Sequence, residues 1–138
     1  MKARVKWAER RTFIGTSGTG HSIVFGNPVD DGPRPGPSPM ELMLIGTAGC
    51  SSFDVVMILE RGRQNVTDCV VEIEAERADT DPKVFTRIHM HFTVTGHKLD
   101  PARVERAIEL SIEKYCSASA MMAATAKLTH DYEIVEPA

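Results

Sequence analysis

The chain has 138 residues, a length typical of one domain. Hydrophobic residues make up 42% and charged residues 25%, which excludes a long disordered chain or a collagen-like repeat. The formal net charge is −3 and no Lys/Arg cluster offsets it, so neither nucleic acid nor an anionic membrane is expected as the main partner. We therefore expect a single domain over residues 1–138.

The same sequence carries indications of cellular location. Its first residues, Met1 to Trp7, contain no apolar run, so no signal peptide is expected. The longest apolar stretch, Met40 to Leu59, is interrupted by polar side chains and is not expected to span a membrane. Three cysteines without a CxxC pair fit a reducing compartment better than a disulfide framework. We expect a soluble cytoplasmic protein.

The N-terminal part of the chain is typical of a meander of short strands. Alternating or apolar runs predict strands over Lys2–Trp7, Arg10–Gly15 and His21–Phe25, with a glycine-containing turn before the third. Five prolines and three glycines follow between Gly26 and Pro39, which excludes a helix or a central strand there. We expect a tethered loop leading into a helix.

That helix has clear start signals and is predicted to run from Pro39 to about Arg61. Ser38 is a good N-cap, Pro39 suits the first helical position, and Glu41 completes a capping box. The helix is apolar on nearly every face, which is typical of a helix buried on all sides. One subunit of this size can hardly cover it, so the sequence predicts a homodimer.

The second half of the chain alternates strands and helices. Two amphipathic strands are predicted around Val71–Ala75 and Ile88–Val94, joined by a hairpin loop. A helix capped by Asp100 is expected to run to about Tyr115–Cys116, followed by a short helix through Ala126 and a last strand over Leu128–Val135. Strands paired in hairpins and combined with these helices predict an α+β fold with antiparallel sheets.

Cysteine is the residue type with the most reactive side chain in this sequence. Cys50 lies midway along the apolar helix, Cys116 lies at the end of the second helix, and Cys69 lies in a strand. All three can be small buried hydrophobes, which is a common use of free cysteine. Gly46 and Gly49 precede Cys50 although glycine costs ~1 kcal/mol in a helix, and they favour close approach of another backbone or of a substrate.

Two motifs in this sequence resemble a known family. The stretch Pro37–Leu42 together with Gly49-Cys50-Ser51-Ser52, and the later Glu113–Ser117 around Cys116, are similar to the OsmC/Ohr proteins, osmotically induced and organic-hydroperoxide-resistance proteins. The match follows the element order over nearly the whole chain and is closest to the YhfA-like branch. This resemblance implies antiparallel sheets around two long central helices in an intertwined homodimer.

The resemblance also implies an activity and roles for residues. It implies a thiol-dependent peroxidase in oxidative or osmotic stress, acting on small organic hydroperoxides with an external dithiol reductant. Cys50 would be the peroxidatic cysteine, and Cys116 would be the resolving cysteine. Cys69 matches neither motif and is expected to be structural. Neither a cofactor nor a metal is expected.

The peroxidatic cysteine must be a thiolate, and a free thiol has a pKa near ~8.5. Cys50 lies ~16 Å from the helix N-terminus, too far for the helix dipole to ionise it. The family supplies an arginine from the N-terminal hairpin, oriented by a glutamate. Here Arg11 is the expected arginine, with Arg10 and Arg34 as alternatives, and Glu41 is the expected glutamate.

This sequence departs from the family at these positions. No Gly-x-Arg-x-Gly motif occurs, and Glu41 is shifted by one residue from the family's glutamate. Asp54 follows Cys50 by one helical turn, so both lie on the same helix face. If its carboxylate is unpaired, it raises the pKa of the thiol. If it pairs with an arginine, it helps to position that arginine.

The sequence also leaves open a binding function without catalysis and a metal site at two histidines. A non-catalytic dimer that binds an apolar small molecule at the subunit interface is the alternative function, with the cysteines as inert core residues. His89 and His91 share one strand face, a spacing that can ligate a metal, although a solvated polar face is the ordinary interpretation.

Overall fold

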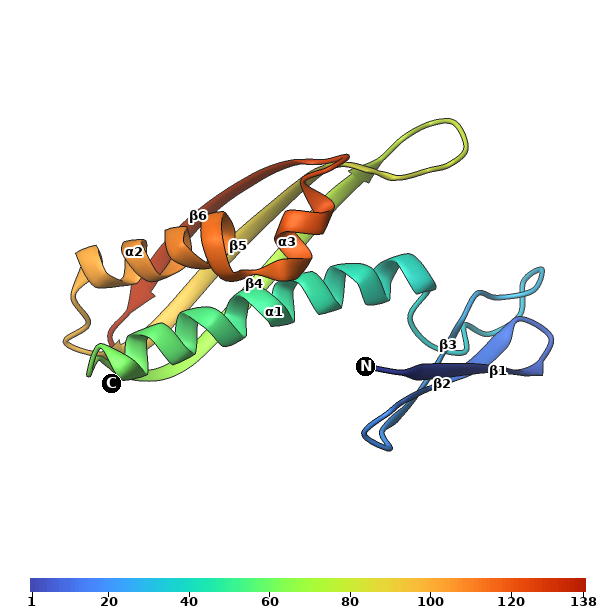
Figure 1. The fold of residues 1–138 in the computed structure, drawn as a ribbon, viewed down its shortest axis with the longest axis horizontal. Coiled ribbons are helices and arrows are strands. Elements are labelled where there is room, and N and C mark those ends of the chain that lie inside the picture. Colours follow the sequence, from blue (N-terminus) through green and yellow to red (C-terminus); the bar gives the residue numbers. More distant parts are fainter. The chain divides into compact units, whose positions relative to one another are not determined.

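A computed structural model describes all residues, Met1–Ala138. They form two compact units, Met1–Leu44 and Ile45–Ala138. The first unit contains three strands and the start of a long helix, and the second contains the rest of that helix, three strands and three shorter helical segments (Figure 1).

The first unit is built on an antiparallel sheet with the strand order β1-β2-β3. Its strands are β1 (Ala3–Glu9), β2 (Thr12–Ser17) and β3 (Ser22–Gly26), which confirms the predicted meander with ends shifted by one or two residues. The rings of Phe13 and Phe25 stack with their centroids 5.8 Å apart and join the last two strands.

The proline-rich segment after β3 folds back onto this sheet. The N–H group of Gly26 donates to the carbonyl oxygen of Pro37 at 3.0 Å. Gly36 lies so close to β3 that a Cβ atom there would collide with the carbonyl oxygen of Val24, which requires glycine. The segment is therefore a tethered loop, as the sequence predicted.

Helix α1 (Pro39–Arg61) begins at the predicted residue. The N–H group of Glu41 donates to Ser38 Oγ at 3.1 Å, and the N–H group of Ser38 donates to Glu41 Oε1 at 2.9 Å. These reciprocal bonds are the capping box, and they satisfy two backbone donors at the helix start.

The second unit contains a sheet with the order β4-β5-β6, formed by β4 (Asn65–Arg77), β5 (Phe85–His97) and β6 (Lys127–Val135). Strands β4 and β5 are antiparallel, as predicted, but β6 runs parallel to β5. The expectation of antiparallel sheets is wrong for this pair. The helical segments between β5 and β6 carry the chain back along the sheet, so β6 starts at the same end as β5.

Three helical segments connect β5 to β6: α2 (Pro101–Leu110), η1 (Ser111–Tyr115) and α3 (Ser117–Met122). Asp100 caps α2 by accepting a hydrogen bond from the N–H group of Ala102 at 3.0 Å, as the sequence predicted. The predicted helix to Tyr115 ends in a π-helical turn, in which the N–H group of Cys116 donates to the carbonyl oxygen of Ser111 at 2.7 Å. Single π turns of this kind are frequent at functional sites.

Helices α1 and α2 cover one face of the second sheet (Figure 1). The core between them consists of fully buried apolar side chains from α1, β5 and α2: Val55, Leu59, Ile88, Met90, Phe92, Val94, Val104, Ala107 and Ile108. The other face of the sheet carries Glu72, Glu74 and Glu76 in exposed positions.

Helix α1 is the one helix long and apolar enough to cross a membrane, with a mean hydropathy of 1.8. Core helices of soluble proteins can have the same length and apolar composition. Its buried residues include Ser51 and Asp54, which form hydrogen bonds with Ser111 inside the second unit. These bonds indicate that this part of α1 packs against other parts of the protein. In one chain Ile45 and Phe53 remain 57% and 69% exposed, so a single copy does not cover every face of α1.

Candidate thiol site

The second unit brings Cys50, Asp54 and Cys116 together. Their sulfur atoms and one carboxylate oxygen all lie within 4.8 Å of one another. Cys50 and Asp54 come from successive turns of α1, and Cys116 comes from the junction of η1 and α3. Cys50 is partly exposed, whereas Cys116 and Asp54 are only 2% and 8% exposed. Of the two cysteines, Cys50 is therefore the more accessible residue.

The sulfur of Cys116 is held by a fixed set of polar groups. It accepts hydrogen bonds from the hydroxyl group of Ser119 at 3.0 Å and from the backbone N–H group of the same residue at 3.3 Å. Burial raises the pKa of the Cys116 thiol, the two bonds from Ser119 oppose that shift, and the neighbouring Cys50 adds to it. Cys116 is thus biased toward its neutral form in the reduced protein.

Asp54 is anchored by serines rather than by an arginine. The Ser111 hydroxyl group donates to Asp54 Oδ2 at 3.0 Å, and the hydroxyl groups of Ser51 and Ser111 lie 2.9 Å apart. All three residues are buried. The sequence left open whether Asp54 is unpaired or pairs with an arginine. Within the second unit, Asp54 pairs with no arginine.

Cys69 lies on β4, outside this cluster. The hydroxyl group of Ser52 donates to its sulfur at 4.0 Å, and burial raises the pKa of its thiol. A thiol with a raised pKa and no cationic neighbour is poorly nucleophilic, which agrees with the structural role expected from the sequence.

The other two expected site residues, Glu41 and Arg11, lie in the first unit. Glu41 serves in the capping box, and its carboxylate pairs with Arg34 at 3.2 Å. Hydrogen bonds from Ser38 hold the pKa of Glu41 below its usual value, and Arg34 adds to this effect. Arg11 lies at the turn between β1 and β2, in a surface hollow that Arg10 and Pro33 also line. Arg34 is thus the arginine that pairs with Glu41.

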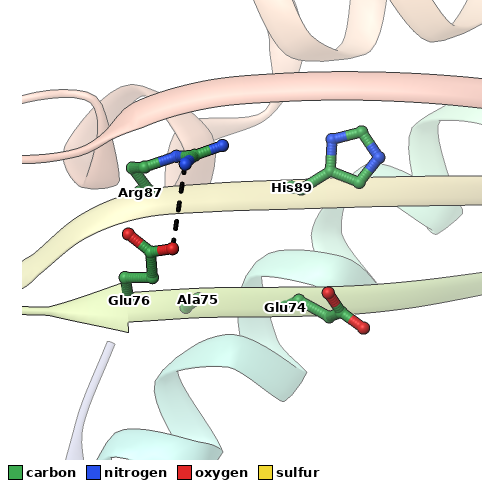
Figure 2. A pocket seen from close by; sticks show the side chains of 5 residues that line it. All are labelled: Glu74, Ala75, Glu76, Arg87 and His89. Atoms are coloured by element: carbon green, nitrogen blue, oxygen red, sulfur yellow. Dashed lines mark ion pairs between the residues drawn. The ribbon is translucent and has the colours of Figure 1, made fainter.

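The polar face of the second sheet carries the histidines that the sequence singled out. Figure 2 shows side chains that line a hollow on this face, among them His89 and the ion pair of Glu76 with Arg87 at 3.7 Å. His89 Nε2 and His91 Nδ1 both bond to Asp131 Oδ1, at 3.0 and 2.8 Å. Asp131 belongs to β6, so its role was not evident from the spacing of the two histidines.

Comparisons with known proteins bear on the whole chain. A family model described as OsmC-like protein matches residues 30–131, a range that contains both cysteines of the cluster. The chain belongs to the OsmC-like family. It is 49% identical over 136 residues to Protein YhfA of Escherichia coli K12, and the match covers 98% of each chain.

Solved structures share this OsmC-like fold. An OsmC-like protein from Mycoplasma pneumoniae superposes with a TM-score of 0.83 at 12% identity, covering 97% of this chain and 96% of that one. The organic hydroperoxide resistance protein OhrB of Bacillus subtilis superposes with a TM-score of 0.65 at 17% identity, covering 96% and 98%. At these identities the likeness establishes the fold.

The residues that sequence reasoning missed at this site are Ser111 and Ser119. Both are fully or almost fully buried and each bonds directly to a member of the cluster. Ser119 follows Cys116 by three residues, the spacing between an N-cap side chain that accepts a hydrogen bond and the backbone N–H group that donates it, which is the one sequence signal that points to Ser119. Ser111 carries no comparable signal.

Proposed function

We propose that this OsmC-like chain is a thiol-dependent peroxidase that reduces organic hydroperoxides through Cys50 and Cys116. The observation that carries the proposal is that the partly exposed Cys50 and the buried Cys116 bring their sulfur atoms within 4.8 Å of each other. The fold is shared with an organic hydroperoxide resistance protein, which supports the same class of substrate.

In the first step the Cys50 thiolate attacks the outer oxygen of the hydroperoxide. A sulfur–oxygen bond forms, the oxygen–oxygen bond breaks, and the alkoxide leaves with the electron pair and takes up a proton to become the alcohol. Cys50 is then a sulfenic acid. Its partial exposure suits it to meet the substrate, and Cys116 is too buried to do so.

In the second step Cys116 condenses with the sulfenic acid. The sulfur of Cys116 bonds to that of Cys50, water leaves, and a disulfide results. The Ser119 hydroxyl and N–H groups stabilise developing negative charge on the Cys116 sulfur during this attack. An external dithiol then reduces the disulfide by exchange.

The ionisation of Cys50 requires a cation, and we propose Arg11, oriented by Glu41, for this role. Arg34 is the second candidate, because it already pairs with Glu41 at 3.2 Å. Replacing each arginine separately by glutamine distinguishes them: loss of the activating residue slows the reaction of Cys50 with hydroperoxide at neutral pH.

We further propose that the active protein is a cytoplasmic homodimer. The exposed apolar residues Ile45 and Phe53 lie on the same helix as Cys50, and burial of such side chains is the main driving force for association.

The proposal is tested by steady-state kinetics on the reduced protein with an alkyl hydroperoxide and a dithiol. Wild-type protein consumes hydroperoxide, Cys50→Ser abolishes consumption, and Cys116→Ser accumulates sulfenic or overoxidised Cys50. Cys69→Ser is the matched control and retains activity. Equal inactivity of wild type and Cys50→Ser would overturn the proposal.

A second candidate function is binding of an apolar small molecule without catalysis. A hollow on α1 lined by Phe53, Val56 and Met57 favours it. Under this alternative an apolar dye binds wild type and Cys50→Ser equally, and neither protein consumes hydroperoxide.

A further inference from the structure

The cluster of Cys50, Asp54 and Cys116 contains a carboxylate that the proposed peroxidase reaction does not need. The proposed reaction assigns roles to both sulfurs and none to the carboxylate. Asp54 nevertheless contributes an oxygen within 4.8 Å of both sulfurs, and it is 8% exposed. Two sulfurs and one carboxylate oxygen are donors that thiophilic divalent metals accept together.

We propose that Cys50, Asp54 and Cys116 form a binding site for a thiophilic divalent cation of the Zn²⁺ type. On a tetrahedral zinc ion the Zn–S distance is about 2.3 Å and the Zn–O distance about 2.1 Å, which sets neighbouring donors about 3.6–3.8 Å apart. The three donors lie within 4.8 Å of one another, so at most about 1.2 Å of closure separates them from this geometry. Magnesium and calcium, which prefer all-oxygen sites, are excluded by the two sulfurs.

The charge balance of the cluster favours a cation. The only hydrogen-bond partner of the Asp54 carboxylate is the neutral Ser111 hydroxyl group, and none of the ion pairs in the chain includes Asp54. Within the second unit, the buried Asp54 carboxylate therefore has no positively charged partner. A divalent cation supplies that charge and favours the thiolate form of both cysteines.

The donors are oriented by a surrounding shell of hydrogen bonds. Ser111 fixes Asp54 at 3.0 Å, and Ser119 fixes Cys116 through its hydroxyl and N–H groups. Such bonds orient metal ligands and are needed for high affinity. Three protein donors would leave a fourth tetrahedral position for water.

This site binds metal only when both cysteines are reduced, so metal and disulfide exclude each other. If the proposed peroxidase activity holds, the two thiols give two electrons and two protons to the hydroperoxide, which becomes alcohol and water. The disulfide that forms offers no thiolate donors, so a bound cation would be released. Metal binding itself requires only the three donors and does not rest on catalysis.

The test is anaerobic titration of the reduced, metal-free full-length protein with Co²⁺, followed by the thiolate-to-cobalt absorption band. We expect one Co²⁺ per chain, displaced by Zn²⁺. Cys50→Ser and Cys116→Ser weaken the band, and Asp54→Asn weakens binding by at least about 10-fold. Cys69→Ser is the matched control and binds as wild type. Cys50 is partly exposed, so Cys50→Ser serves as the decisive variant should the buried substitutions impair folding.

Absence of a thiolate band in wild type, or binding unaffected by Cys50→Ser, would overturn the metal site. The same metal-free preparation is assayed with an alkyl hydroperoxide and a dithiol, which separates the two proposals. Activity without a cobalt band overturns the metal site alone, and a cobalt band without activity overturns the proposed peroxidase alone.

Discussion

The hydroxyl group of Ser111 donates a hydrogen bond to Oδ2 of Asp54 across 3.0 Å, and both residues are buried. This bond joins the π-helical turn that ends before Cys116 to the turn of α1 that follows Cys50. It therefore fixes the two elements that carry the cysteines relative to each other.

Removing this donor is expected to destabilise the fold. Ser111→Ala leaves the buried Asp54 carboxylate without its partner, which costs about 1–3 kcal/mol of unfolding free energy. Denaturant unfolding of the reduced protein measures the loss. Ser117→Ala, at an exposed serine of the neighbouring helix, is the control and changes stability little. A Ser111→Ala protein as stable as wild type contradicts the role given to this bond.

Ser119→Ala is expected to raise the pKa of Cys116 further. Burial already raises that pKa, and the substitution removes the Ser119 hydroxyl bond that opposes the shift. Because alkylation requires the thiolate, the rate for Cys116 falls roughly tenfold near pH 8. The measurement uses a Cys50→Ser, Cys69→Ser background, in which Cys116 is the remaining thiol. An unchanged pH profile would show that the Ser119 hydroxyl does not act on the sulfur.

The histidine pair on the polar sheet face gives a pH-dependent contribution to stability. The hydrogen bond with Asp131 raises the pKa of His91 above its ordinary value of 6.5, and the same bond lowers the pKa of Asp131 below 3.8. The His91 contribution is complete below pH 6.5 and is lost as the pH rises through the raised value. The Asp131 contribution is present above pH 3.8 and is lost as the pH falls through the lowered value.

Titration of the His91 ring by NMR checks this coupling. Asp131→Asn returns the pKa of His91 toward 6.5, because the carboxylate that favours the charged ring is gone. Glu105→Gln, an exposed change on α2, serves as control and leaves the titration unaltered. A His91 pKa insensitive to Asp131→Asn would contradict the assignment.

Phe53 provides a test of the proposed homodimer. It is 69% exposed in one chain, and Phe53→Glu places a charge on this apolar face of α1. Light scattering is expected to show a dimer for wild type and a shift toward monomer for Phe53→Glu. Arg61→Ala on the same helix is the control. A monomeric wild type would contradict the dimer, and an undisturbed Phe53→Glu dimer would place the interface elsewhere.

The sequence predicted those features of the fold that depend on neighbouring residues. The start of α1 follows from Ser38, Pro39 and Glu41, whose capping bonds form within one turn. The amphipathic strand β5 follows from the alternation around Met90 and Phe92. The direction of β6 does not follow in this way, because it depends on the path of the chain through α2 and α3.

The candidate site was less accessible to sequence reasoning. Asp54 is visible as one turn after Cys50, but its partner Ser111 lies in another element, and no local pattern connects them. Likewise the π-helical turn before Cys116 replaces the regular helix that the apolar spacing predicted. The meeting of Cys50 and Cys116 was expected only from family resemblance, and it is packing of α1 against η1 and α3 that brings the sulfurs together.

Whether Cys50 and Cys116 act as a redox pair is measured by stoichiometric oxidation of the reduced protein with an alkyl hydroperoxide, followed by peptide mapping with mass spectrometry. We expect loss of the two thiols of Cys50 and Cys116 per hydroperoxide consumed, one disulfide between them, and a free Cys69. Full retention of all three thiols, or a disulfide that includes Cys69, would contradict it.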